Sequence, residues 1–143
     1  MIRSRLKHHQ EEDIKLVNKY AGKLGLKLKE FHLNDELELY FDVFRGNDLK
    51  SICYISRGWD DPGYRVGESI IIDKNILEFK EKFYKIINIC ADNLIAVKVS
   101  PLKDDKVQLD IQIGIYHDGF NEKVLSEAIS SLGDSLQKIG QLL

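Results

Sequence analysis

The sequence contains the unbroken alternating stretch Val107-Gln108-Leu109-Asp110-Ile111-Gln112-Ile113-Gly114-Ile115-Tyr116. Successive side chains of a β-strand point to opposite faces, so this alternation predicts a strand with one buried face. The five odd-numbered apolar residues face a core and the polar residues between them face water, which is typical of an antiparallel sheet covered on one side. Their burial contributes on the order of 8–15 kcal/mol before chain entropy is subtracted. A layer of helix must therefore cover that face.

The rest of the chain supplies helices and further strands. Apolar residues recur at three- and four-residue steps in three segments, which predicts three helices. The first covers about residues 10–24. The second begins at a capping box formed by Asn75 and Glu78 and ends at Asn93, and the third runs from Asn121 to the C-terminus. Alternating or β-branched runs predict strands at about 26–33 with a bulge near Glu30, 37–44, 51–57, 68–73 and 94–100. The run 68–73 is either a fourth strand or the continuation of the third. The predicted class is α+β, an antiparallel sheet with helices on one face, in the order α-βββ(β)-α-ββ-α.

Two of the predicted helices have wide apolar faces. We expect the second to lie across the sheet because its face combines Ile76, Leu77, Phe79, Phe83, Ile86, Ile87 and Cys90. The last helix carries a heptad seam formed by Leu125, Ile129, Leu132, Leu136 and Ile139 and continued by Leu143. This seam packs on the sheet, pairs with the same helix of a second copy, or does both. We expect a homodimer with these five residues in its interface.

Length and composition set limits on the class of protein. The 143 residues, 43% of them hydrophobic, suffice for one globular domain spanning residues 1–143, with residues 1–9 as a frayed extension. No run of eighteen apolar residues is present and no apolar stretch follows the basic N-terminus, so we expect no membrane span, no secretory signal and a cytoplasmic location. Cys53 and Cys90 are expected to be buried free thiols. A formal charge of −2 and a pI near 6.1 argue against nucleic acid as a partner.

The segment 57–65 is the strongest candidate for a functional surface, in a loop expected from Gly58 to Gly67. Asp61-Pro62-Gly63 fits a turn with Pro and Gly at its centre, which would bring the single Trp near the Tyr that follows the turn. Because Trp, Tyr and Arg dominate binding hot spots, the candidate partner-binding residues are Trp59, Asp60, Tyr64 and Arg65. In the alternative, Trp59 closes the core while Asp60 pairs with Arg65 on the surface.

Three polar groups are weighed as chemical sites. Asp60 and Asp61 are neighbours whose side chains point apart, and no nucleophile or Gly-rich phosphate loop lies beside them in the sequence. The group His8, His9, Glu12 and Asp13 lacks a third fixed ligand and indicates a solvated helix face. His117-Asp118-Gly119 indicates a turn before a helix rather than a general base. We therefore expect no catalytic residue, no metal and no cofactor.

The element order resembles that of type III secretion chaperones and of the YbjN-type domains of bacteria and archaea, over the whole chain. These families are small cytoplasmic α+β proteins, usually dimeric, that hold partner polypeptides or have unassigned regulatory roles. The resemblance implies a non-enzymatic, homodimeric module that binds a protein or peptide, through the exposed sheet face or the Trp59 loop. The alternative hypothesis is a small-molecule-binding or enzymatic domain with a pocket between the second predicted helix and the sheet.

Overall fold

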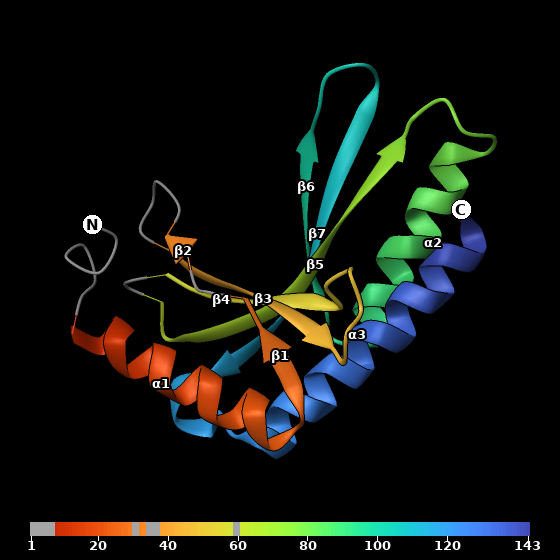
Figure 1. Ribbon diagram of the computed structural model, residues 1–143. Helices are drawn as coiled ribbons and strands as arrows, with labels where there is room; N and C mark the ends of the chain where they lie inside the picture. Colours follow the sequence, from red (N-terminus) through yellow and green to blue (C-terminus); the bar gives the residue numbers. More distant parts are fainter. Residues whose placement is uncertain (1–7, 30–31, 34–37, 59–60) are drawn as a thin grey trace. The chain divides into compact units, whose positions relative to one another are not determined.

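The computed structural model describes residues 8–29, 32–33, 38–58 and 61–143 (Figure 1). The described helices are α1 (His8–Lys23), α2 (Phe79–Asp92) and α3 (Glu122–Leu142), with a short 3-10 helix, η2 (His117–Gly119), before α3. The strands are β1 (Leu26–Leu28), β2 (His32–Leu33), β3 (Leu39–Arg45), β4 (Cys53–Arg57), β5 (Gly63–Asp73), β6 (Ala96–Pro101) and β7 (Lys106–Tyr116). The α+β class and the predicted order of elements are confirmed.

The strands form an antiparallel sheet in the order β1-β3-β4-β5-β7-β6, and β2 also pairs with β3. Since β1 and β2 both pair with β3, the predicted first strand is interrupted into two short pieces. The predicted bulge at Glu30 lies outside the described residues, as does Leu37. At the two ends of the β5–β7 ladder, the backbone N–H of His117 donates to Pro62 O at 3.1 Å and that of Lys74 donates to Asp105 O at 2.7 Å.

The described chain divides into two compact units. Unit 1 comprises Met1–Val66 and Gly114–Ile129, and unit 2 comprises Gly67–Ile113 and Ser130–Leu143. The long elements β5, β7 and α3 each contribute residues to both units. The expectation of one domain stays a prediction, and each unit is described by itself.

The core of unit 1 is built from alternate residues of short strands and from one stripe of α1. Leu39, Phe41 and Val43 of β3 are buried, as are Val17 and Ala21 of α1. The helix ends at Lys23 and is followed by the predicted capping residue Gly25, whose φ of +70° favours glycine. The Gly25 N–H donates to Gly22 O at 3.0 Å. The predicted facing of the strand at 37–44 is therefore confirmed over its described part.

The core of unit 2 confirms the one-sided alternation of the organising strand. Val107, Leu109 and Ile111 of β7 are buried, whereas Gln108 and Gln112 are only half-buried. Ile115, in unit 1, is also buried, and Ile113 is half-buried. The other buried apolar residues of unit 2 include Ile72, Ile86, Cys90, Ile95, Leu132 and Ile139. Both cysteines are buried and free, as predicted.

The start of α2 differs from the prediction. The helix begins at Phe79 after Glu78, whose φ of 57° is left-handed and whose side chain makes no capping hydrogen bond. The Asn75 N–H donates to Asp73 Oδ1 at 2.8 Å, so residues 73–76 form a turn and the predicted capping box is wrong. The apolar face is also narrower than expected, because Leu77 is 78% exposed and only Ile86 and Cys90 of α2 are buried. The helix ends at Asn93 as predicted.

The loop predicted from Gly58 to Gly67 is shorter than expected, because β5 begins at Gly63. The predicted turn at 61–63 is wrong as well, because Gly63 is already part of a strand. The Asp61 N–H donates to Gly58 O at 3.2 Å. Gly63 has another role. A Cβ atom placed on it would lie 2.1 Å from Ile115 O, so the close approach of β5 and β7 requires glycine there.

The start of α3 is as predicted. The Asn121 side chain accepts a hydrogen bond from the Val124 N–H at 3.0 Å and caps the helix. Within the described residues, no helix combines the length and the apolar character needed to cross a bilayer.

Candidate functional site

A buried carboxylate on α1 connects three elements of unit 1. Asp13 accepts one hydrogen bond from Arg57 Nη1 at 2.5 Å and another from the Tyr64 hydroxyl at 2.7 Å. Arg57 is the last residue of β4 and Tyr64 is the second residue of β5. These three residues, which we call the buried triad, therefore tie α1 to two adjacent strands of the sheet.

The buried triad is shielded from water. The side chain of Asp13 is 1% exposed and that of Arg57 is 11% exposed. A buried ion pair is tolerated only when hydrogen bonds replace the lost hydration, and Arg57 Nη2 also donates to Asp61 O at 3.3 Å. The Arg57 guanidinium lies 5.2 Å from the centroid of the Tyr64 ring, a cation–π contact. Among the described residues, Asp13 Oδ2 and Arg57 Nε make no further hydrogen bond.

Tyr64 is the centre of an aromatic cluster. Its ring stacks on Phe120 with the centroids 4.1 Å apart, and Phe120 meets Tyr20 of α1 edge-on at 5.4 Å. Burial, and next the hydrogen bond to the Asp13 carboxylate, raise the pKa of the Tyr64 hydroxyl well above its usual value. The hydroxyl therefore stays protonated and remains a donor to Asp13.

Asp61 organises the end of the β4–β5 connection. Its Oδ2 accepts the Gly58 N–H at 2.9 Å, and its carboxylate forms an ion pair with Arg65 at 3.0 Å. Its backbone carbonyl accepts the second Arg57 donor described above. The ion pair at this surface position is thus tied through Arg57 to the buried triad.

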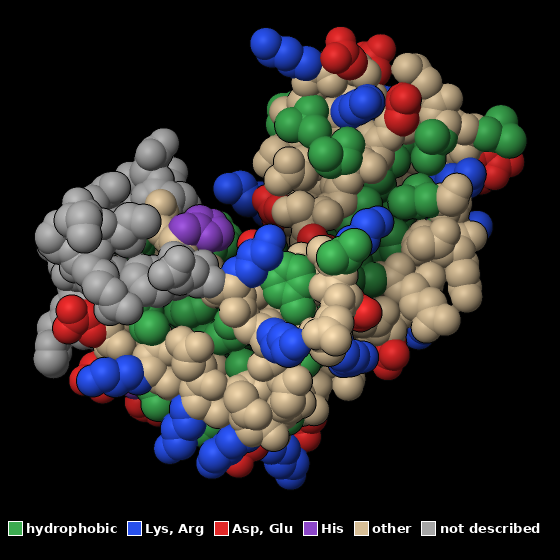
Figure 2. Space-filling model, viewed as in Figure 1, with side chains coloured by type: hydrophobic (Ala, Val, Ile, Leu, Met, Phe, Trp, Pro, Cys, Tyr) green, Lys and Arg blue, Asp and Glu red, His purple; other side chains and the backbone are tan. Residues whose placement is uncertain are grey.

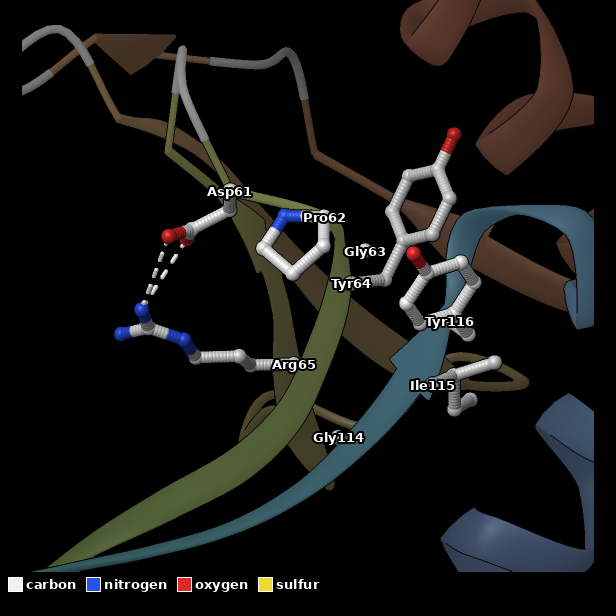
Figure 3. Close-up of a pocket in the computed structure, with 8 residues that line it drawn as sticks. All are labelled: Asp61, Pro62, Gly63, Tyr64, Arg65, Gly114, Ile115 and Tyr116. Atoms are coloured by element: carbon white, nitrogen blue, oxygen red, sulfur yellow. Dashed lines mark hydrogen bonds and ion pairs between the residues drawn. The ribbon is translucent and has the colours of Figure 1, made fainter.

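A surface hollow of about 430 Å³ lies where β5 and β7 meet (Figure 3). We call it the hollow; its lining residues are Asp61, Pro62, Gly63, Tyr64, Arg65, Gly114, Ile115 and Tyr116. Tyr116 is 68% exposed, whereas Tyr64 is buried in its wall. Figure 3 shows the adjacent side chains of Tyr64 and Arg65 pointing to opposite sides of β5. The hollow therefore offers an aromatic side chain and a neutralised ion pair to solvent.

In the strands of unit 1, the residues between the buried ones point to the opposite side of the sheet, which we call the outer face. We define this outer face by His32, Tyr40 and Tyr54, which the strand registers place on one side of the sheet, and by Arg65 and Tyr116, which alternate with the buried Tyr64 and Ile115. The rings of His32 and Tyr40 stack at 5.5 Å, and those of Tyr40 and Tyr54 also lie 5.5 Å apart. In Figure 2, the purple histidine side chain lies over β2, with green hydrophobic side chains beside it. Aromatic and basic groups are thus combined on one face of unit 1.

The predicted partner-binding residues have different outcomes. Trp59 and Asp60 lie outside the described residues. Tyr64 is 1% exposed and serves the buried triad, so its prediction as a partner contact is wrong. Arg65 does lie at the surface, where it pairs with Asp61 and lines the hollow.

The groups weighed for chemistry are placed as follows. Asp13 is buried in the triad, so its assignment to a solvated helix face is wrong. His117 lies in η2, with its Nδ1 3.3 Å from Asp118 Oδ1, which agrees with the predicted turn. In the part of the chain that the structure describes, no three His, Cys, Asp or Glu side chains gather as metal ligands would.

Sequence reasoning missed the roles of Asp13 and Arg57. A signal was present, because Gln10, Asp13, Val17 and Ala21 are spaced three, four and four apart and all four are buried. Polar residues within an apolar stripe indicate a buried polar contact. The identity of the partners, however, depends on strands more than forty residues away.

The predicted dimer-interface residues lie mainly inside the chain. Leu125, Ile129, Leu132 and Ile139 are buried, and Leu136 is half-buried. Side chains that are buried within one copy have little surface left for another. A homodimer must therefore use other side chains than these four.

The fold and site define an α+β protein with a mostly apolar hollow and an aromatic outer face on its sheet. Neither a family model nor a curated protein matches this chain. It is similar to a crystal structure of an uncharacterized protein from Methanothermobacter thermautotrophicus, with a TM-score of 0.69 and 10% identity over 90% of this chain and 94% of that one. This similarity shows the fold alone.

Proposed function

We propose that the protein is a non-enzymatic module that binds another protein or peptide and acts as a homodimer, in the manner of the secretion-chaperone-like regulators that it resembles in element order. The observation that carries the proposal is the outer face of unit 1. It combines a row of aromatic rings with Arg65 and the exposed Tyr116. Tyr and Arg supply much of the binding energy of protein interfaces, because they bury a large area and also donate hydrogen bonds.

The chemistry of the hollow supports binding rather than catalysis. Asp61 and Arg65 neutralise each other at 3.0 Å, so neither is poised as a free acid, base or electrophile. The raised pKa of Tyr64 keeps its hydroxyl protonated and engaged with Asp13. What the hollow offers a partner is shape, apolar area and a few hydrogen-bonding groups.

A small-molecule site is the second candidate. The hollow, at about 430 Å³, falls in the range of about 300–1,000 Å³ that is typical of ligand pockets. It lies at β5 and β7 rather than against α2, where the sequence suggested a pocket. Titration of the protein with a fragment library tests this candidate. A fragment that binds in the hollow should change the NMR chemical shifts of the Gly63 and Gly114 amides.

Selection from a displayed random-peptide library tests the proposed function. The affinity of each selected peptide for the wild-type protein and for the Tyr116→Ala variant is then measured by fluorescence anisotropy. We expect at least a tenfold loss of affinity, about 1.4 kcal/mol, because an exposed aromatic contact is removed. Tyr84→Ala is the matched control, since Tyr84 is also well exposed but lies on α2 in unit 2. Equal binding by wild type and Tyr116→Ala excludes the outer face as the peptide site.

A further inference from the structure

The strand β6 ends the sheet order, and within the described residues it pairs with β7 alone. The turn after β6 shows which of its residues form hydrogen bonds with β7, because the Leu102 N–H donates to Lys106 O at 2.9 Å. Antiparallel partners exchange backbone hydrogen bonds at every second residue, so even-numbered residues of β6 bond to β7. The backbone groups of Val97 and Val99 therefore point away from β7, toward the edge of the sheet.

The fold leaves one apolar side chain of this edge strand exposed. Val99 is directly opposite Leu109 in the register and lies on the same face of the sheet. Leu109 is 0% exposed, yet Val99 is 46% exposed. An exposed apolar side chain thus lies beside a row of outward-pointing backbone groups.

The edge strand β6 has few protecting residues. Natural edge strands are protected by charged side chains, especially Lys, by proline, by bulges, by short length or by a covering helix or loop. In β6 the sequence Ala96-Val97-Lys98-Val99-Ser100-Pro101 holds one charge, and its only proline lies at the last position. The edge is therefore suited to receive another strand along Val97 and Val99.

We propose that β6 is where a second copy of this chain docks, with two β6 strands paired antiparallel about a twofold axis at Val99. This inference rests on the homodimer in the proposed function and names its surface. The pairing places Val99 against Val99 of the partner subunit and Lys98 beside Ser100 of the partner subunit. Val99 exchanges two hydrogen bonds across the axis, and each Val97 N–H donates to the carbonyl of Pro101 of the partner subunit. Because proline has no N–H, the Val97 carbonyl receives no hydrogen bond from that residue in return.

Self-complementarity favours a second copy over an unrelated strand. The register centred on Val99 covers the open apolar side chain of each copy with the same side chain of the other, in an isologous contact. Shifting the axis to Lys98 would bring two lysines directly opposite each other, which is destabilising. The pairing of six-residue strands buries less than the roughly 1,200 Å² of a stable interface. The dimer is therefore in concentration-dependent exchange with the monomer.

Sedimentation velocity over a range of protein concentrations tests the inference, with Val99→Lys as the disrupting variant. We expect wild type to dimerise as its concentration rises, and Val99→Lys to raise the dimer dissociation constant at least tenfold, because like charges meet at the axis. Ile71→Lys is the matched control, because Ile71 is 59% exposed on β5, which β7 separates from β6 in the sheet order. This variant should dimerise as wild type does. Circular dichroism and thermal melting establish that both variants are folded.

Amide hydrogen exchange by NMR locates the contact without mutation. The amides of Val97 and Val99 should exchange more slowly at high protein concentration, while that of Lys98, bonded to β7, should not change. A monomer at every concentration overturns both this inference and the homodimer. A dimer that survives Val99→Lys overturns the β6 interface alone. Protection of Val99 only when a different polypeptide is added assigns the edge to that partner and also overturns the inference.

Discussion

At the scale of the residue, Asp13 accepts hydrogen bonds from side chains 44 and 51 positions further along the chain. A carboxylate removed from water needs such donors, because its unpaired burial is unfavourable by several kcal/mol. Arg57 supplies the opposite charge, and Tyr64 supplies a neutral donor together with an aromatic surface. The buried triad thus holds α1 against β4 and β5 and positions Asp61 at the hollow.

Tyr64→Phe should destabilise the protein by about 1–2 kcal/mol, because the buried Asp13 carboxylate loses one of its two donors. Urea unfolding followed by circular dichroism measures this difference. Tyr116→Phe removes a hydroxyl from an exposed ring and should leave the free energy of unfolding unchanged. Equal effects of the two changes would show that the hydrogen bond of Tyr64 contributes nothing to stability.

The raised pKa of Tyr64 predicts a loss of stability in alkali. The unfolded chain releases this proton near pH 10, whereas the folded chain retains it at higher pH. The contribution of Tyr64 is therefore complete below about pH 10 and declines above it by up to about 1.4 kcal/mol per pH unit. Unfolding free energies at several pH values should fall less steeply for Tyr64→Phe than for wild type. Parallel curves for the two proteins would contradict the pKa direction.

At the scale of the element, the ladder between β5 and β7 depends on a close backbone approach at one glycine. Gly63 and Gly114 both line the hollow, but they differ in what surrounds them. A Cβ on Gly63 would collide with Ile115 O, whereas one on Gly114 would meet nothing within 4 Å. Comparing Gly63 with Gly114 therefore separates two effects of replacing glycine: the collision of a new side chain with β7, and the general change in backbone freedom within a strand.

Gly63→Ala should destabilise the protein by about 1–3 kcal/mol, because the strands must separate to admit the methyl group. Gly114→Ala is the control, and it should be neutral or slightly stabilising because the unfolded chain loses freedom. Thermal unfolding by calorimetry compares the two variants. A Gly63→Ala protein as stable as wild type would contradict the close approach.

The first turn of α3 offers a second test at this scale. Asn121→Ala should lower the free energy of unfolding by about 1 kcal/mol, since the Val124 N–H loses its acceptor. Asn121→Asp retains an acceptor and should keep most of the stability. Chemical unfolding of both variants measures the difference, and equal losses would exclude capping as the cause.

At the scale of the whole molecule, three elements run through both compact units. Because β5, β7 and α3 belong to each unit, we expect the units to unfold together in one transition. Leu109→Ala removes a fully buried side chain from unit 2 and should destabilise the protein by about 2–5 kcal/mol. Native-state hydrogen exchange should show the same loss in α1 and in α2. A loss confined to α2 would mean that the units are separate folding domains.

Much of the fold follows from patterns that are local in sequence. The alternation of residues 107–116 predicted β7 and its buried face, Gly25 predicted the end of α1, and Asn121 predicted the cap of α3. Prediction failed where two local signals competed. Asn75 and Glu78 have the spacing of a capping box, but Asn75 is held in a turn by Asp73 and Glu78 takes a left-handed conformation. The Pro-Gly pair at 62–63 resembles a turn, yet Gly63 starts a strand.

The sequence by itself determined the class, the order of elements and the facing of the organising strand, because periodicity depends only on neighbouring residues. Tertiary structure alone decided that Asp13 and Tyr64 are buried partners, that Arg65 pairs with Asp61, and that β6 ends the sheet. Each of these depends on which distant strand lies alongside. A side chain's hydrogen bonds and exposure are set by its neighbours in space, and one-dimensional spacing does not specify them.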